Sequence, residues 1–274
     1  MTDRLGWGRR YLLVEPRHFD VTYCINPWMQ PGVDTAAAQL EWKRLAAALE
    51  SLGATVHVAG DQPGLPDMAF AMNAGFVWGS RAVPSRFRHA ERRAEEPHWR
   101  ACFEQLGLEV VELPAPPEVR FEAGDAFVQD GLLVGGWGFR SDRAALDALG
   151  EVCGLPVLPL RLVDERFYHF DTCFCPLGQG AALAYLDAFS PDDAARLVKA
   201  LPHVIALDAS EAVAFAANSL VVGNTFVTAR CPDRVAAELA RLGLDVMTVE
   251  VSEFQKSGGS VRCLTLPLDL GPEA

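Results

Sequence analysis

The sequence predicts an α/β protein made of ββαβ modules repeated around a pseudo-fivefold axis. Three observations lead to this prediction. One order of short apolar runs, a turn and a helix recurs along the chain from residue 67 onward. Paired apolar runs alternate regularly with segments of helical periodicity. Finally, each end of the chain carries an incomplete module, so that the last strand can complete the first module and close a ring.

Four complete copies carry the repeat. Each copy opens with a polar or acidic residue, continues through two apolar runs joined by a glycine turn, and ends with a helix and a third strand. The copies span residues 73–113, 122–160, 169–207 and 218–251. The apolar runs on either side of QDG and of VGN are typical of β-hairpins.

The helical segments have clear periodicity and end signals. DDAARLVKAL (192–201) and DRVAAELARLG (233–243) place Ala, Leu and Val at three- and four-residue spacing. Each begins with aspartate, which suits the first turn of a helix, and the second ends at a glycine. We therefore expect one outer helix in each module.

The amino-terminal segment supplies the fifth module but lacks one strand. It contains YLLVEP (11–16), a loop with CINPWMQPG (24–32), the helical pattern of residues 36–53, and ATVHVAG (54–60). The missing strand can come from SVRCLTLPL (260–268), after the fourth full copy. Because no linker interrupts the repeats, residues 1–274 are predicted to form a single domain.

Composition limits the function classes. The chain has 274 residues, 50% of them hydrophobic, and a formal net charge of −12. No basic footprint for nucleic acid is present, and the short run RFRHAERR (86–93) is expected to be a solvated loop or helix start. The amino terminus has no apolar segment long enough for a signal peptide or a membrane span. Seven cysteines without framework spacing favour a reducing, cytoplasmic setting.

A ring would gather the polar residues that open each copy. Because these residues occupy equivalent positions, they would converge on the axis, and carboxylates, amides, an imidazole and a thiol would then form one candidate site. The residues concerned are Asp67, Asn73, Glu122, Asp125, His169, Asp171, Asn218 and Cys263.

The chemistry of these residues favours a cationic substrate. A cysteine in an apolar strand is usually a core residue, but Cys263 follows Gly-Gly-Ser, which permits close approach of a ligand. The spacing of His169 and Asp171 predicts that both lie on one face of a strand. Several carboxylates around a thiol suit a flat guanidinium cation, which would also lower the pKa of the thiol.

Two other motifs are weak. His169, Cys173 and Cys175 offer three metal ligands, but no fourth ligand stands nearby. GQGAAL (178–183) has leucine where a dinucleotide fingerprint needs glycine, and it lies between hairpin strands. We therefore predict neither a metal nor an organic cofactor.

Eight segments together resemble the guanidino-group-modifying (amidinotransferase) superfamily, most closely the bacterial dimethylarginine dimethylaminohydrolases. This resemblance spans nearly the whole chain and implies the pentein fold, a five-bladed αβ-propeller. The segments are RRYLLVEPRHFDVTYCINPWM (9–29), GLPDMAFAMNAG (64–75), FRHAER (87–92), EAGD (122–125), GFRSD (138–142), RFYHFDT (166–172), AFSP (188–191) and GGSVRC (258–263).

The resemblance implies roles for individual residues. Cys263 matches the family nucleophile, His169 the general acid/base, and Glu122 the carboxylate that holds the guanidinium and orients the histidine. Arg86 and Arg140 match arginines for the substrate carboxylate. The remaining implied contacts with substrate, direct or supporting, are Asn26, Asp67, Asn73, Asp125, Asp171 and Ser260.

One position leaves the substrate open. Deiminases and many dimethylargininases carry an acid where this chain has Asn73, whereas arginine dihydrolases and actinobacterial dimethylargininases carry asparagine. We expect a hydrolase that converts dimethylarginine to citrulline and dimethylamine through a thiouronium on Cys263. The alternatives are an arginine dihydrolase that releases ornithine, ammonia and carbon dioxide, an amidinotransferase, and a non-catalytic binding protein. A homodimer is left open by the sequence.

Overall fold

Five three-stranded sheets form the β-structure in the computed structural model, which describes residues 4–271. Their strand orders are β15-β1-β2, β3-β4-β5, β6-β7-β8, β9-β10-β11 and β12-β13-β14. The strands are β1 (Arg10–Glu15), β2 (Thr55–Gly60), β3 (Gly75–Trp78), β4 (Arg81–Pro84), β5 (Glu109–Val110), β6 (Ala126–Gln129), β7 (Leu132–Trp137), β8 (Val157–Arg161), β9 (Phe174–Gly178), β10 (Ala181–Ala184), β11 (His203–Ala206), β12 (Leu220–Val222), β13 (Thr225–Thr228), β14 (Asp245–Thr248) and β15 (Leu266–Pro267).

Each sheet has the same pairing, an antiparallel pair followed by a parallel third strand. In the third module, for example, β6 pairs antiparallel with β7, and β7 pairs parallel with β8. The crossover between the two parallel strands carries a helix, as parallel pairing requires. The α/β class and the ββαβ repeat predicted from the sequence are confirmed.

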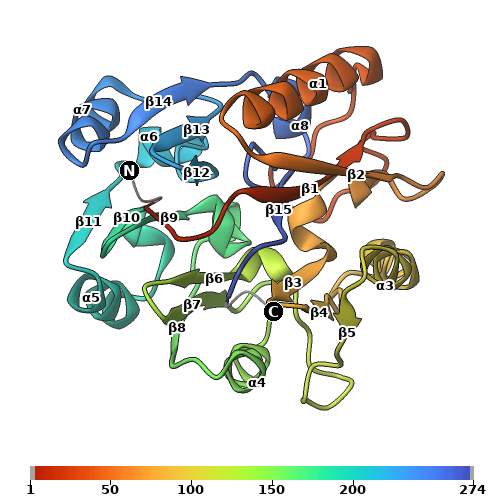
Figure 1. The fold of residues 1–274 in the computed structure, drawn as a ribbon, viewed down its shortest axis with the longest axis horizontal. Helices are drawn as coiled ribbons and strands as arrows, with labels where there is room; N and C mark the ends of the chain where they lie inside the picture. The colour runs from red at the N-terminus through yellow and green to blue at the C-terminus, as the bar shows by residue number, and fades with distance from the viewer. Residues whose placement is uncertain (1–3, 272–274) are drawn as a thin grey trace.

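Helices cover the outside of the molecule. Figure 1 shows the sheets around a common centre, with α1, α3, α4, α5 and α7 at the periphery. The helices are α1 (Thr35–Ser51), α2 (Ala90–Arg93), α3 (Glu96–Gln105), α4 (Arg143–Cys153), α5 (Pro191–Ala200), α6 (Ala209–Val213), α7 (Asp233–Arg241) and α8 (Ser252–Gln255). None of the helices within residues 4–271 is both long and apolar enough to cross a bilayer.

The ends of the helices follow the sequence signals. Asp34 caps α1 by accepting hydrogen bonds from the backbone N–H groups of Ala36 and Ala37. Ser190 caps α5 in the same way, since its side chain accepts a hydrogen bond from the backbone N–H of Asp193. Pro191 occupies the first turn of this helix. These caps fix where each outer helix starts and so how its apolar face meets the sheet.

Residues near the carboxyl end complete the first sheet. Leu266 and Pro267 pair antiparallel with Leu12 and Tyr11 of β1, as the sequence predicted. The Asp269 carboxylate accepts hydrogen bonds from the backbone N–H groups of Gly8 and Arg9. The closing strand is shorter than expected, however, because residues 261–264 form a turn and Cys263 lies in this turn.

Short 3-10 turns precede the first strands of three modules. They are η2 (Ala71–Ala74), η3 (Ala123–Asp125) and η5 (Phe170–Thr172). The predicted strand through His169 and Asp171 is therefore wrong, since His169 caps η5 and Asp171 lies inside it. Both side chains are therefore held by a 3-10 turn whose middle residue, Phe170, is buried in the core.

A cluster of aromatic rings packs around the turn η5. The rings of Phe170 and Phe174 stack with centroids 4.5 Å apart, and Phe127 lies 5.8 Å from Phe170. All three side chains are buried. Because Phe170 stands between His169 and Asp171, packing of its ring fixes the positions of both neighbours.

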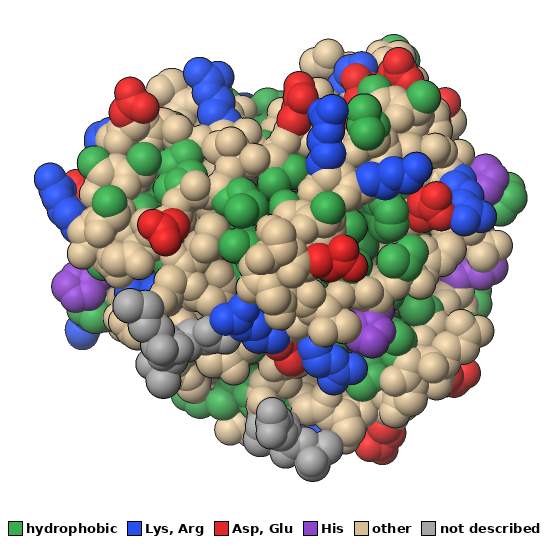
Figure 2. Space-filling model, turned by 45° about the horizontal axis from the view of Figure 1, so that its top comes forward, with side chains coloured by type: hydrophobic (Ala, Val, Ile, Leu, Met, Phe, Trp, Pro, Cys, Tyr) green, Lys and Arg blue, Asp and Glu red, His purple; other side chains and the backbone are tan. Residues whose placement is uncertain are grey.

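The charge distribution agrees with the acidic composition. On the face shown in Figure 2, Lys and Arg side chains are scattered among acidic ones and do not form a basic patch. The run 86–93 contains the start of α2 and is mostly exposed or half-buried, as predicted, but Arg92 within it is only 2% exposed. Its guanidinium pairs with Glu95, which is also buried.

Closure of the first sheet can be tested at Asp269. Replacing Asp269 with alanine removes the acceptor for two backbone N–H groups. We expect the free energy of unfolding to fall by about 1 to 3 kcal/mol, measured by urea denaturation. Asp245→Ala, at an exposed aspartate of β14, serves as the control and should change it by less than about 0.5 kcal/mol. Equal losses in both variants would contradict a special role of Asp269.

Candidate active site

Twelve residues from separate modules line a narrow cleft above Cys263. Its free volume is about 10 Å³, so at most about one water molecule fits. The lining residues are Ile25, Asn26, Asp67, Phe70, Asn73, Arg92, Arg140, Tyr168, His169, Ser257, Gly259 and Cys263. The predicted convergence of acids, amides, imidazole and thiol is therefore present in the structure.

Asn218 holds the thiol in position. The Cys263 Sγ lies 3.0 Å from Asn218 Nδ2 and donates to Asp171 Oδ2 at 3.1 Å. Asn218 Oδ1 accepts from the backbone N–H groups of Ser260, Arg262 and Cys263. One buried amide thus fixes both the loop and its sulfur.

The glycines before Cys263 are required by close packing. A Cβ on Gly259 would lie 2.3 Å from the Phe70 ring and 3.1 Å from Cys263 Cβ. Gly258 has φ +86, a conformation that favours glycine, and a Cβ there would meet Asn26 Oδ1 at 2.7 Å. Ser260 does not line the cleft; its hydroxyl accepts a hydrogen bond from Gln255.

His169 lines the cleft and pairs with the buried Glu122, which lies behind it. His169 Nε2 lies 2.7 Å from Glu122 Oε2, and Arg140 Nη1 donates to the same oxygen at 3.0 Å. The other carboxylate oxygen accepts from the backbone N–H of Arg88. His169 Nδ1 is buried and has no hydrogen-bond partner among the described residues.

The charge states of this pair follow from their surroundings. Burial alone would raise the pKa of Glu122, but Arg140 and His169 outweigh it and hold that pKa well below the usual range. Burial lowers the pKa of His169 to about 4, although Glu122 opposes the shift. At neutral pH the imidazole is therefore neutral, donates from Nε2 to Glu122, and keeps a lone pair on Nδ1.

The thiol is protonated in the free protein. Burial, and then the negative charge of Asp171, raise the pKa of Cys263 well above its usual range. Burial likewise raises the pKa of Asp171 to about 7. Formation of a thiolate therefore requires added positive charge in the cleft.

Asp67, Asn73 and Asn26 stand on other walls of the cleft. Ser257 donates to Asp67 Oδ1 at 3.3 Å, and burial raises the pKa of Asp67. Asn73 Oδ1 accepts from the Gly124 N–H at 3.1 Å. Asn26 Nδ2 donates to the carbonyl of Ser257 at 3.0 Å. These contacts fix the three side chains.

The EAGD motif has a structural explanation. A Cβ on Gly124 would lie 2.6 Å from Asn73 Oδ1, so glycine lets Asn73 approach. Asp125 accepts hydrogen bonds from the backbone N–H groups of Ser141 and Phe170 and does not line the cleft. Asp125 therefore joins two modules behind the cleft.

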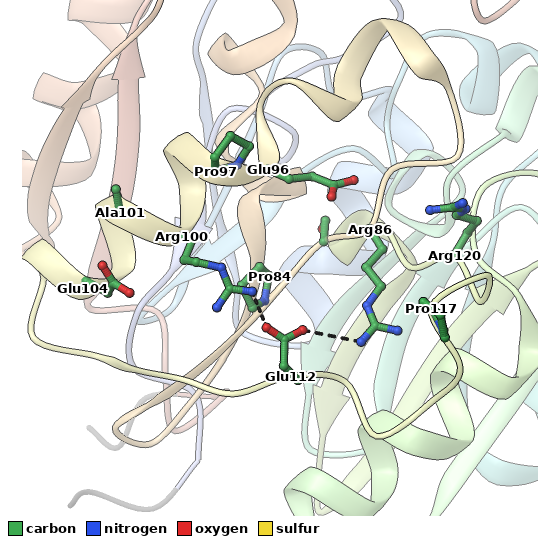
Figure 3. Close-up of a pocket in the computed structure, with 11 residues that line it drawn as sticks. Pro84, Arg86, Glu96, Pro97, Arg100, Ala101, Glu104, Glu112, Pro117 and Arg120 are labelled. Atoms are coloured by element: carbon green, nitrogen blue, oxygen red, sulfur yellow. Dashed lines mark hydrogen bonds and ion pairs between the residues drawn. The ribbon is translucent and has the colours of Figure 1, made fainter.

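Arg86 does not lie in the cleft, contrary to the sequence prediction. Figure 3 shows it in a separate pocket, where Glu112 pairs with both Arg86 and Arg100. This pocket has a volume of about 530 Å³. The Arg86 guanidinium also donates to the carbonyls of Leu113, Ala115 and Pro116. Arg86 forms an antiparallel bridge with Phe121, and its side chain holds the loop 111–117 on the outside.

Arg92, and not Arg86, lies at the cleft. It lines the cleft and donates to both carboxylate oxygens of Glu95, at 2.7 and 2.8 Å. Its Nη2 also donates to the carbonyl of Asp67 at 3.1 Å. Arg140, the second predicted arginine, lines the same cleft and stacks over the Tyr168 ring at 4.6 Å.

Six lining residues were not among the predicted site residues: Ile25, Phe70, Arg92, Tyr168, Ser257 and Gly259. All of them except Ser257 lie within matched segments, so the signal was present but pointed to their neighbours. Their contribution depends on packing: Phe70 packs on Gly259, and the hydroxyl of Tyr168 donates to the carbonyl of Gly258.

The cysteines near His169 make backbone contacts. Cys173 donates to the carbonyl of Phe170, and Cys175 to that of Ser219. Within residues 4–271, no three His, Cys, Asp or Glu side chains come together in a way that could hold a metal ion.

The chain is similar to known proteins over most of its length. A family model described as N,N dimethylarginine dimethylhydrolase, eukaryotic, matches residues 30–270. A bifunctional arginine dihydrolase/ornithine cyclodeaminase, AgrE, from Nostoc sp. is 39% identical over 97% of this chain and 38% of its own length. This chain thus spans about two fifths of that relative. The N(G),N(G)-dimethylarginine dimethylaminohydrolase of Mycobacterium tuberculosis is 35% identical over 95% of this chain and 86% of its own length.

Solved structures agree with these relatives. The N-terminal domain of ArgZ, a cyanobacterial arginine dihydrolase bound to substrate, has a TM-score of 0.92 and 37% identity, covering 96% of this chain and 98% of that domain. A dimethylarginine dimethylaminohydrolase bearing an S-methyl-L-thiocitrulline adduct has a TM-score of 0.78 and 20% identity, covering 94% and 99%. The second similarity shows the fold alone.

The raised pKa of Asp171 has a testable effect on stability. The folded protein holds this proton up to about pH 7, whereas the unfolded chain releases it near the usual value. Stability from this group therefore falls as pH rises through that window. As pH rises through this window, the free energy of unfolding of Asp171→Asn, measured by urea denaturation, should increase relative to that of the parent by on the order of 1 kcal/mol for each pH unit.

The same measurement on Asp187→Asn, at an exposed aspartate of η6 (Leu186–Ala188), gives the effect of losing an aspartate elsewhere. If the difference between Asp171→Asn and the parent does not change with pH, the argument for Asp171 is wrong.

Proposed function

This chain belongs to the dimethylarginine dimethylaminohydrolase family, whose hydrolases act on guanidino groups, and from this premise we propose that its substrate is free L-arginine. The reaction is a dihydrolysis through a covalent adduct on Cys263, and it yields ornithine, two ammonia and carbon dioxide. The choice of arginine rests on Asn73 in the cleft. Arginine thus replaces dimethylarginine, which was the substrate expected first from the sequence.

Asn73 supports the choice of arginine because the oxygen of its side-chain amide already accepts a hydrogen bond. Its Oδ1 accepts a hydrogen bond from Gly124, so the amide NH₂ is the end left for a ligand. An NH₂ donor stabilises an oxygen that develops during hydrolysis, whereas a carboxylate at this position would repel that oxygen. Dihydrolysis adds water twice and so passes through more oxygen-bearing adducts than a single hydrolysis.

The cleft suits a guanidinium cation with an amino-acid tail. Asp67 offers a carboxylate to the space, while Asp171 stands behind Cys263 and Glu122 stands behind His169. Arg92 and Arg140 line the same cleft and suit the carboxylate of the substrate. Because the free volume is about 10 Å³, the cleft has to widen before a guanidinium substrate can enter.

The first step forms a thiouronium. When the guanidinium enters, the Cys263 thiol gives its proton to His169, and the thiolate adds to the guanidino carbon. His169 returns the proton to one terminal nitrogen, which leaves as ammonia while the carbon–sulfur bond remains. Glu122 stabilises the imidazolium that exists between these two transfers, since its pKa lies well below the usual range.

The second step decides the product. Water, deprotonated by His169, adds to the thiouronium carbon. If the adduct expels the thiolate, citrulline is released; if it expels the second ammonia, a thiocarbamate remains on Cys263. Another water then releases the thiol and a carbamic acid, which loses carbon dioxide to give ornithine. Arginine and two waters account for every atom of the products.

Dimethylarginine is the second candidate substrate. The match to the family model and the similarity to the Mycobacterium tuberculosis enzyme favour it. It would follow the same first step, release dimethylamine, and end as citrulline.

We also propose that the five sheets form a five-bladed αβ-propeller, the pentein fold, in one domain. The repeated pairing of each sheet and the completion of the first sheet by β15 support this arrangement.

The nucleophile can be tested by substitution. Cys263→Ser should reduce turnover of arginine more than about a thousandfold, because an alcohol is a far weaker nucleophile here than a thiolate. Ammonia release and mass spectrometry of the products measure this. Cys102→Ser, on α3, should keep its activity. Substantial turnover by the Cys263 variant would disprove the assignment.

The substrate choice can be tested at Asn73. The parent should convert arginine to ornithine and labelled carbon dioxide, with little citrulline from dimethylarginine. Asn73→Asp should lose ornithine formation by about tenfold or more, because the carboxylate repels the developing oxyanion. Citrulline from dimethylarginine alone in the parent would instead support the second candidate. Transfer of the amidino group to added glycine would identify an amidinotransferase.

A further inference from the structure

Arg262 is a buried cation directly before Cys263 in the chain. Its side chain is only 1% exposed. The guanidinium carbon lies 4.8 Å from the centre of the Phe127 ring and 5.5 Å from that of Trp7. Arg262 does not line the cleft, so its guanidinium stands behind the nucleophile, away from the substrate.

The guanidinium is not neutralised in the way the other arginines of the site are. Its Nε and Nη1 atoms have no hydrogen-bond partner among residues 4–271, and no carboxylate of these residues forms an ion pair with it. Arg92 and Arg140 each have such a partner, Glu95 and Glu122. A buried cation without a paired anion is costly, and rings offset only part of that cost.

Four titratable groups interact electrostatically with this guanidinium. They are Tyr11, Cys175, Asp171 and Cys263, which come from β1, the segment of β9, η5 and the turn before β15. Burial raises the pKa of Tyr11 well above its usual range and that of Cys175 to about 12, so both stay neutral near pH 7. The groups left to balance the cation are Asp171 and Cys263.

Asp171 and Cys263 are joined by one hydrogen bond. The thiol donates to Asp171 Oδ2 at 3.1 Å, and Asp171 Oδ1 has no partner among the described residues. The pair must lose a proton before the sulfur can attack, and burial opposes that loss. A fixed positive charge behind the pair acts in the opposite direction, and it is present before substrate arrives.

We propose that Arg262 is a positioning residue whose buried charge favours loss of a proton from the Asp171–Cys263 pair. It acts on the reaction through these two groups and does not touch the substrate. The substrate guanidinium supplies the second positive charge from the opposite side. The proposal rests on the proposed function of Cys263 as nucleophile.

Alkylation of Cys263 tests the proposal without turnover. Iodoacetamide is neutral and reacts with the thiolate, so its rate constant follows thiolate formation as pH changes. Arg262→Met should move the midpoint of this profile upward by about one pH unit and slow alkylation about tenfold below the midpoint. The readout is peptide mass spectrometry of Cys263 across the pH range.

Three comparisons complete the design. Arg262→Lys keeps a positive charge and should restore the midpoint most of the way to that of the parent. Arg161→Met removes another guanidinium above a ring, that of Trp137, outside the cleft, and should leave the midpoint unchanged. In steady-state turnover of arginine, Arg262→Met should lower kcat with little change in KM. If Arg262→Met does not fold, Arg262→Gln replaces it.

The outcomes separate the two proposals. A parent in which Cys263 is not alkylated, or in which arginine does not alter its alkylation, overturns the proposed function. A parent that behaves as expected, together with an Arg262→Met or Arg262→Gln profile of the same midpoint, overturns the role of Arg262 alone. A fall in kcat without a midpoint shift does the same, since it would come from altered packing.

Discussion

The buried amide of Asn218 is the contact on which the site depends. Its oxygen accepts three backbone N–H groups from the loop before β15, and its nitrogen donates to Cys263 Sγ and to the carbonyl of Asp171. One side chain thus joins the loop near the carboxyl end to the turn η5. This contact also positions two other parts of the cleft. His169 directly precedes η5, and Gly258 of the loop before Cys263 packs closely against Asn26.

Buried charge dominates the chemistry around this contact. Three acids, Asp67, Glu122 and Asp171, meet three arginines, Arg92, Arg140 and Arg262, in a region with little space for water. Two of the arginines are paired, and the pKa of Glu122 is low as a result. The free cleft keeps a neutral imidazole and a protonated thiol, since burial outweighs the remaining pairing. A cationic ligand changes that balance, which links binding of a guanidinium to activation of sulfur.

The same residues explain how far sequence reasoning could go within the site. Spacing and family resemblance located Cys263, His169, Glu122, Asp67, Asn73 and Arg140, since their motifs are local. Neighbouring residues alone do not decide whether Arg86 or Arg92 lies at the cleft. The short helix α2 turns the chain so that Arg92 faces inward, while loop 111–117 holds Arg86 outside. The strand predicted through His169 is instead the 3-10 turn η5, in which Phe170 packs against Phe127 and Phe174.

The sequence by itself determined the modules, since apolar periodicity, helix caps and turn residues are properties of neighbouring residues. It also determined which chemical groups were available, including the thiol after two glycines. The tertiary structure alone decided which of these groups face each other, because Asn218, Asp171 and Cys263 are brought together from three different modules. It also decided their charge states, since burial and pairing set a pKa and neither can be read from spacing along the chain.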